Sequence, residues 1–169
     1  MPSSIKQHLG FSLILVFALF TSACGFRLGG FIELPDKLQP LHIQSQDGAT
    51  HFAATLARQL EQSGITLSSE LTPSRLRLEL KDFSSGQRQV VFGSTEAFEL
   101  SLHITASAKD SEGEALFTNQ VFQAYRQYAY KRTESLFARD NLRNKLLRSM
   151  EDDLIRQLTL RIQVLQPWK

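Results

Sequence analysis

Cys24, the one cysteine of this 169-residue chain, follows a segment with the three parts of a bacterial export signal. Residues 1–8 are polar with one basic side chain, Lys6, and residues 9–20 are uncharged and mostly large and apolar. Small residues then lead into the cysteine: Thr21, Ser22 and Ala23. This order is typical of a cleaved signal peptide, and the apolar part is too short to span a membrane.

A cysteine directly after the cut suggests a particular chemistry, because lipoprotein maturation acylates a thiol at that position. Thr21 departs from the leucine that this motif prefers, and a chance cysteine is the alternative. We predict a signal peptide over residues 1–23 and lipidation of Cys24. Each buried acyl methylene contributes about 0.8 kcal/mol, so several chains on one cysteine would anchor the protein stably. Gly25, where an aspartate would retain a lipoprotein at the inner membrane, predicts a lipid anchor in the outer membrane and a body facing the periplasm.

The mature chain, residues 24–169, has the length of one domain. Without Lys6 it carries 18 basic and 17 acidic side chains, a net charge of about +1. That balance argues against recognition of a polyanion by bulk charge, and lipidation would place the chain away from nucleic acid. Since no second cysteine exists, an intramolecular disulfide is excluded and the fold must rest on its apolar core.

Residues that could do catalysis are scattered. The histidines of the mature chain, at positions 42, 51 and 103, share no metal-ligand spacing, and no second thiol accompanies them. Acidic residues stand singly except for Glu151-Asp152-Asp153, which is typical of a solvated helix face. Neither Gly29-Gly30 nor Ser84-Ser85-Gly86 joins a strand to a helix as a phosphate loop does. The sequence therefore predicts no catalytic residue, no metal site and no cofactor, and a protein that is not an enzyme.

One stretch departs from the even charge balance. Between Arg126 and Arg148 seven basic residues face only two acidic ones, and aromatic residues interleave with them: Tyr125, Tyr128, Tyr130 and Phe137. Basic groups beside apolar surface suit a ligand that is both phosphorylated and hydrophobic. The alternative is a solubilising helix face, which charge statistics alone favour.

The elements that must position these residues follow from periodicity. Residues 24–40 lack a sustained pattern and predict an extended arm, and 41–45 alternate as a short strand. A helix is expected over 51–63, capped by Asp47 or Thr50 and ended by Gly64. Strands are expected over 75–81, continuing at 89–92, then over 98–108 and 114–130, although polar residues obscure the phase of the last.

The longest helical pattern begins after Ser135, a plausible cap, and ends at Pro167. Its apolar residues recur every three or four positions: Leu142, Leu146, Met150, Leu154, Leu158, Ile162 and Leu165. We expect Leu146 and Leu154 to be buried against a sheet. The predicted fold is α+β in the order β-α-β-β-β-α, a mostly antiparallel four-stranded sheet with two helices on one face, in a single domain over residues 41–169.

Three short motifs resemble those of the LPS-assembly lipoproteins, the LptE or rare lipoprotein B family. Cys24-Gly25-Phe26-Arg27-Leu28 resembles the family's opening after the lipidated cysteine. Thr95-Glu96-Ala97-Phe98-Glu99 resembles its strand entry "TAEYQ", and Leu136-Phe137-Ala138-Arg139-Asp140-Asn141 resembles its helix entry "ALAKDN". The resemblance runs over nearly the whole mature chain.

This resemblance implies a non-enzymatic role. Such proteins plug the lumen of the outer-membrane β-barrel LptD, aid its assembly and bind lipopolysaccharide. The basic residue before Asp-Asn in the helix motif, which helps bind lipopolysaccharide, maps onto Arg139. A second basic residue of the family has no counterpart in the uncharged 90–93 segment, and Arg88 is the nearest candidate. With Arg126 and Arg143 from the basic stretch, these residues form the predicted lipopolysaccharide-binding set.

A reading from another class remains open. The chain could be a periplasm-facing lipoprotein adaptor or secretion pilot that binds a protein partner and no lipid. The two readings differ in what they require of Arg88, Arg126 and Arg139. Convergence of these side chains favours lipopolysaccharide binding, and unrelated directions favour the adaptor.

Overall fold

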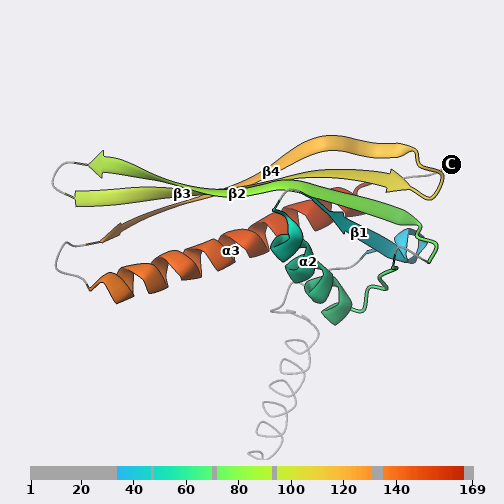
Figure 1. Ribbon diagram of the computed structural model, residues 1–169, viewed down its shortest axis with the longest axis horizontal. Coiled ribbons are helices and arrows are strands. Elements are labelled where there is room, and N and C mark those ends of the chain that lie inside the picture. Colours follow the sequence, from blue (N-terminus) through green and yellow to red (C-terminus); the bar gives the residue numbers. More distant parts are fainter. Residues whose placement is uncertain (1–33, 47, 70–71, 93–94, 131–134, 166–169) are drawn as a thin grey trace, which may run out of the picture. The chain divides into compact units, whose positions relative to one another are not determined.

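The computed structural model describes residues 34–46, 48–69, 72–92, 95–130 and 135–165 (Figure 1). The predictions for the signal peptide, for Cys24 and for most of the arm lie outside these residues, as does Asp47. A 3-10 helix, η1 (Asp36–Leu38), precedes these elements: β1 (Leu41–Ser45), α2 (Thr50–Gln62), β2 (Leu76–Phe92), β3 (Thr95–Asp110), β4 (Ala115–Tyr130) and α3 (Leu136–Gln163). The predicted α+β class and the order β-α-β-β-β-α are confirmed.

The sheet has the order β1-β2-β3-β4. β1 pairs with β2 in parallel, with α2 as the crossover between them, and β2, β3 and β4 form an antiparallel meander. β1 pairs only with Leu76–Leu80 of β2. From Asp82 onward the described part of β2 therefore has a sheet neighbour on one side only, β3, and Figure 1 shows α2 and α3 on the same face of the sheet.

The core lies between that face, called the inner face below, and the two helices. Alternation along β2 and β3 directs their leucines and Ile104 inward, where each is at most 2% exposed: Leu76, Leu78, Leu80, Leu100 and Leu102. α2 contributes Phe52, Leu56 and Leu60 at helical spacing, each at most 1% exposed. The predicted cap Thr50 is wrong: Thr50 is the first helical residue, and Ala49 precedes it without a side-chain cap.

α3 has the predicted start, because the Ser135 hydroxyl accepts a hydrogen bond from the backbone N–H of Ala138 at 3.2 Å. Its buried stripe runs from Met150 to Ile162. Leu154 is fully buried as predicted, whereas the prediction for Leu146 is wrong, since this side chain is only partly buried. The reason is that the inner face opposite this part of α3 carries Arg126 and Tyr128. These large polar side chains are themselves only half-buried.

A bulge joins the two predicted pieces of β2 into one strand. Between Lys81 and Ser84 the pairing with β3 shifts, and Asp82 takes a positive φ of 56°. The extra residue lets Phe83 turn inward, where its ring stacks on Phe52 at 5.3 Å between centroids. The bulge therefore keeps β2 in contact with α2 while its polar residues stay on the other face, the outer face.

A second bulge explains why the phase of β4 is hidden in the sequence. Asn119 has a positive φ of 49°, and its N–H donates to the Ser107 hydroxyl at 2.9 Å instead of to a backbone carbonyl. Phe117 and Phe122, an odd number of positions apart, are both buried as a result. After the bulge Ala124 points inward and Tyr125 outward, with 5% and 54% exposure.

No helix within the described ranges has a stretch that is both long enough and apolar enough to span a membrane.

The buried stripe of α3 predicts a graded response to truncation along one helix. Leu154→Ala should lower the free energy of unfolding by about 2–5 kcal/mol, because it opens a cavity in the core. Leu142→Ala removes the same atoms from a side chain that is 37% exposed and should cost less than about 1 kcal/mol. Urea unfolding measures both, and equal losses would show that the helix is seated differently.

Candidate functional site

The four arginines of the predicted lipopolysaccharide-binding set come from three elements. Arg88 lies on β2, Arg126 on β4, and Arg139 and Arg143 in the first two turns of α3. Residues opposite each other in an antiparallel pair share a face, so Arg88 beside Glu99 lies on the outer face and Arg126 beside the buried Leu100 lies on the inner face. The sheet separates them.

The charge of Arg126 is neutralised by a carboxylate of α3. Its guanidinium forms an ion pair with Asp153 of α3, with the two side chains 38% and 23% exposed, and Arg156 approaches the same carboxylate at 3.3 Å. The acidic run of α3 is thus partly engaged, contrary to the expectation of a purely solvated face. Asp152 accepts a hydrogen bond of 2.9 Å from Gln59 of α2, which links the two helices. Arg126 fastens β4 to α3.

Arg88 is bound on the outer face. Its Nη2 donates to Glu99 Oε1 at 2.8 Å, and Gln127 Nε2 donates to the other carboxylate oxygen at 3.2 Å. The hydrogen bond from Gln127, followed by the bond and charge of Arg88, lowers the pKa of the Glu99 carboxyl below its ordinary value. Glu99 therefore stays ionised, and the pair is close to neutral.

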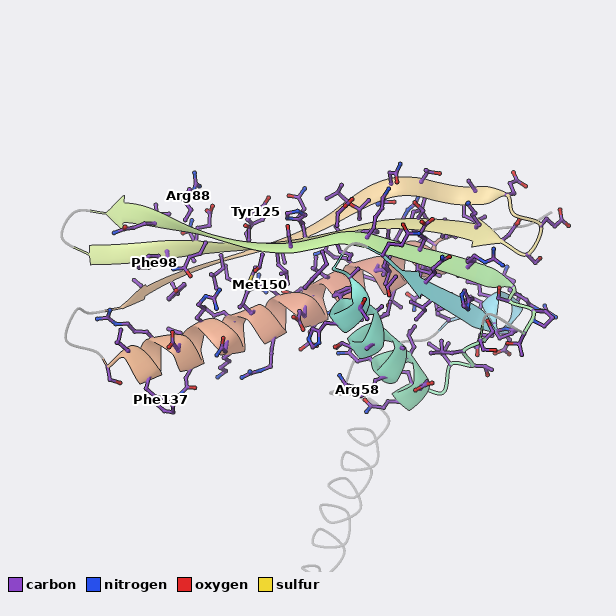
Figure 2. The ribbon with its side chains drawn as sticks, in the orientation of Figure 1. Arg58, Arg88, Phe98, Tyr125, Phe137 and Met150 are labelled. Carbon is purple, nitrogen blue, oxygen red and sulfur yellow. The ribbon has the colours of Figure 1, made fainter. Side chains whose placement is uncertain are left out.

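Arg139 and Arg143 form the one pair within the set that the structure brings together. They are four residues apart on α3 and so share a helix face, and both are half-buried. Arg143 Nε donates to Gln87 Oε1 on β2 at 3.0 Å. Leu136 and Phe137, in the same helix turn as Arg139, are 75% and 77% exposed. This helix corner, defined by Leu136, Phe137, Arg139 and Arg143, combines two cations with exposed apolar surface. Figure 2 shows Phe137 at the start of α3.

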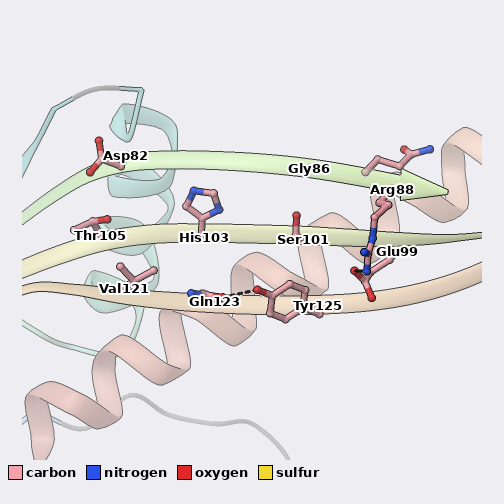
Figure 3. Close-up of a pocket in the computed structure, with 11 residues that line it drawn as sticks. Asp82, Gly86, Arg88, Glu99, Ser101, His103, Thr105, Val121, Gln123 and Tyr125 are labelled. Atoms are coloured by element: carbon pink, nitrogen blue, oxygen red, sulfur yellow. Dashed lines mark hydrogen bonds and ion pairs between the residues drawn. The ribbon is translucent and has the colours of Figure 1, made fainter. Parts of the chain in front are cut away.

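A feature that the sequence analysis missed is a hollow on the outer face, with a volume of about 730 Å³ (Figure 3). Polar side chains of β2, β3 and β4 line it, among them Arg88, Glu99, Ser101, His103 and Gln123, with Tyr125 at one side. The strict alternation of β3 in the sequence could have identified its contribution to the hollow, since every second residue from Glu99 to Thr105 lines it. The contribution of β4 could not be assigned, because the Asn119 bulge hides its phase.

The described side chains offer little for catalysis. None of their His, Cys, Asp and Glu residues gather in groups of three or more that could hold a metal ion. On the outer face, a hydrogen bond of 2.7 Å joins His103 Nε2 and the Ser84 hydroxyl. The helix corner presents cations and apolar groups, and the hollow presents hydrogen-bonding groups.

Comparison with known proteins gives one sequence relative and several structures. No family model matches the chain. LPS-assembly lipoprotein LptE of Photorhabdus laumondii is 30% identical over 105 residues, which cover 61% of this chain and 58% of that protein. The chain thus spans less than two thirds of the relative's length. The match confirms the resemblance to LPS-assembly lipoproteins that the sequence motifs predict.

Solved lipoprotein structures share the fold. Lipoprotein B of Nitrosomonas europaea has a TM-score of 0.66 at 20% identity, covering 83% of this chain and 90% of its own. The minor lipoprotein of Acinetobacter baumannii gives 0.60 at 21%, with 78% and 93% covered. The rare lipoprotein B of Shewanella oneidensis gives 0.55 at 16%, with 72% and 89% covered. At these identities the likeness establishes the fold alone.

The Arg88–Glu99 pair makes a prediction about titration. Arg88→Ala should raise the pKa of Glu99 toward its ordinary value, because it removes both the hydrogen bond and the charge of Arg88, while the Gln127 hydrogen bond, the largest single cause of the lowered pKa, remains. A lowered carboxyl pKa stabilises the folded state at pH values above the pKa of the unfolded state. This contribution disappears as the pH falls through the pKa of the folded state. NMR titration of the Glu99 side chain measures the shift. Arg58→Ala on α2 is the control, because Arg58 donates its hydrogen bond to Thr55 of the same helix, and it should leave the pKa of Glu99 unchanged.

Proposed function

We propose that this chain is a non-enzymatic outer-membrane lipoprotein that works with an LptD-like β-barrel to assemble lipopolysaccharide at the cell surface. The observation that carries this proposal is the 30% identity over 105 residues to a protein named LPS-assembly lipoprotein LptE. The fold shared with lipoproteins of the B type supports it. The predicted acylation of Cys24 would supply the membrane anchor, with the body facing the periplasm.

A role as a plug inside the barrel agrees with the chemistry of the sheet. Barrels large enough to hold another protein enclose a polar lumen. The outer face of the sheet carries hydroxyl, amide and paired charged groups, and the apolar inner face is covered by α2 and α3. Such a sheet can enter a water-filled lumen without uncovering its core. Filling and steadying the barrel requires binding and no reacting group.

The helix corner is the part of the chain that suits lipopolysaccharide. Guanidinium groups bind phosphates bidentately, and the N-terminus of α3 adds a modest positive field near Arg139. Leu136 and Phe137 offer apolar contact beside these charges for the acyl region of the same ligand. In this proposal Arg139 and Arg143 bind the phosphates, Arg126 holds β4 on α3 and so supports the corner, and Arg88 is a separate contact on the other face.

One observation favours a second candidate function, a protein adaptor or secretion pilot. Arg88, Arg126 and Arg139 do not converge, since Arg88 lies on the outer face and Arg126 is paired with Asp153. A protein adaptor or secretion pilot without a lipid ligand would not need them to converge. The relationship to LPS-assembly lipoprotein LptE weighs against this alternative.

Purification from membranes separates the two functions. A C-terminal tag on the full chain should recover a large outer-membrane β-barrel together with bound lipopolysaccharide, extracted in mild detergent. A different protein partner without either of them would overturn the proposed function and support the adaptor. An unrelated tagged lipoprotein of the same membrane controls for co-extraction.

Substitution of Arg139 tests the helix corner. Charge-assisted contacts contribute about 1.5–3 kcal/mol, so Arg139→Asp should weaken lipopolysaccharide binding by roughly ten- to a hundredfold while the barrel still copurifies. The control is Arg58→Asp on α2, an exposed arginine with the same change of charge. Arg161 is a poorer control, because it hydrogen-bonds Gln120 and packs over the Phe117 ring. Equal losses in both variants would mean that the ligand senses net charge and that no site exists at the corner.

A further inference from the structure

The hollow on the outer face is built around a glycine. Gly86 lies within β2, and a β-carbon at this position would come within 2.6 Å of the Ser101 hydroxyl on β3. A glycine inside a strand often marks a place where a ligand approaches the backbone closely. The floor at Gly86 and Ser101 is therefore low, and the longer side chains of Arg88 and Tyr125 lie next to it (Figure 3).

The charge of the hollow selects against an anionic ligand. Its lining has one cation, Arg88, and two carboxylates, Asp82 and Glu99. The cation is already bound to Glu99 at 2.8 Å, which leaves the hollow without positive charge to offer. A phosphate or a nucleic acid would meet carboxylates there. A neutral ligand meets no such penalty.

The other groups suit a ligand that both donates and accepts hydrogen bonds. Ser101, Thr105 and Gln123 each carry a donor and an acceptor. Polar ligand groups leave water without loss only when hydrogen bonds replace those to water, so this lining favours a polyhydroxyl compound over an acyl chain. The Tyr125 ring, 54% exposed, gives one apolar face, and its hydroxyl is tied to Gln123.

The hollow also connects with the helix corner. Gln87 is paired with the buried Leu100 and so belongs to the inner phase of β2, yet it also lines the hollow. Its Oε1 accepts the hydrogen bond from Arg143 Nε at 3.0 Å. Because β2 has no neighbour other than β3 along this stretch of the described sheet, a ligand can pass from one face to the other around it. The cationic corner and the hollow, whose lining has no net positive charge, thus suit two chemically different parts of one amphiphilic molecule.

We propose that the outer-face hollow binds uncharged sugars of the saccharide chain of a lipopolysaccharide, with Tyr125 packing against a sugar ring and the Ser101 and Gln123 side chains hydrogen-bonding its hydroxyls. This inference rests on the proposed function for the source of the saccharide. A wall of the partner barrel is the competing occupant. Protein interfaces are usually centred on a cluster of buried aromatic, arginine or aliphatic anchors, whereas here Tyr125 and Val121 lie among polar side chains and Arg88 is paired with Glu99.

The test uses the full mature lipoprotein in a nonionic detergent whose headgroup contains no sugar. The probes are the polysaccharide released from lipopolysaccharide by mild acid, the lipid A left behind, and dextran as an unrelated neutral polysaccharide. Isothermal titration should detect the released polysaccharide and not dextran. Tyr125→Ala should weaken its binding by about threefold to tenfold, and Tyr125→Phe should retain most of it.

Phe137→Ala is the matched control, because it also removes an exposed ring, at 77% exposure, but from the helix corner. It should leave binding of the released polysaccharide unchanged. Thermal melting checks that each variant is folded. Several results would overturn the inference: no binding of the released polysaccharide, equal binding of dextran, or equal losses in Tyr125→Ala and Phe137→Ala.

Two further outcomes separate the inference from the function on which it rests. If lipid A binds through Arg139 and the released polysaccharide does not bind, the saccharide site in the hollow is rejected. The proposed function is then unaffected. Loss of barrel copurification in Tyr125→Ala with unchanged polysaccharide binding would assign the hollow to the barrel wall and reject the saccharide. Polysaccharide binding without lipid A binding or a copurifying barrel would support the hollow and overturn the proposed function.

Discussion

Burial of one face of the sheet under two helices is the constraint on which the rest of the structure depends. The leucines of β2 and β3 are closed off by Phe52 and Leu56 of α2 and by Leu154 and Leu158 of α3. With a single cysteine in the chain, no disulfide can substitute for this packing. An antiparallel sheet covered on one side leaves the other side for water or a ligand. The polar outer face is therefore a direct consequence of where the core lies.

The sequence predicted the elements well and their phases incompletely. Alternation located β3, helical spacing located α2 within one residue at each end, and Ser135 marked the start of α3. The two bulges could not be foreseen, because Asp82 and Asn119 adopt a positive φ that their residue types permit but do not require. One extra residue turns every following side chain to the other face. For the same reason the phase of β4, and with it the direction of Arg126 and Tyr125, became visible only in the structure.

The candidate site shows the limit of reading charge along a chain. The basic stretch 126–148 suggested one cluster, yet the ion pair that removes Arg126 from it joins residues 27 positions apart. Spacing of four residues on one helix is local, which is why Arg139 and Arg143 do lie together as their sequence positions imply. Arg88 lies before the uncharged 90–93 segment, where the resemblance led us to expect a second basic residue, and the period of two in a strand places it on the outer face. Local neighbours were predictable, and partners across the sheet were not.

The arrangement of charge explains how one small domain could handle a ligand with unlike ends. The helix corner, where phosphates and acyl chains would bind, has Arg139, Arg143 and the exposed Phe137. In the hollow, where uncharged groups would bind, the cation Arg88 is paired with Glu99. The lowered pKa of Glu99 keeps its carboxylate ionised and the pair intact as the pH falls toward the ordinary glutamate range. The lack of net positive charge in the hollow is thus maintained by a specific contact, and the two surfaces remain chemically distinct although Gln87 joins them.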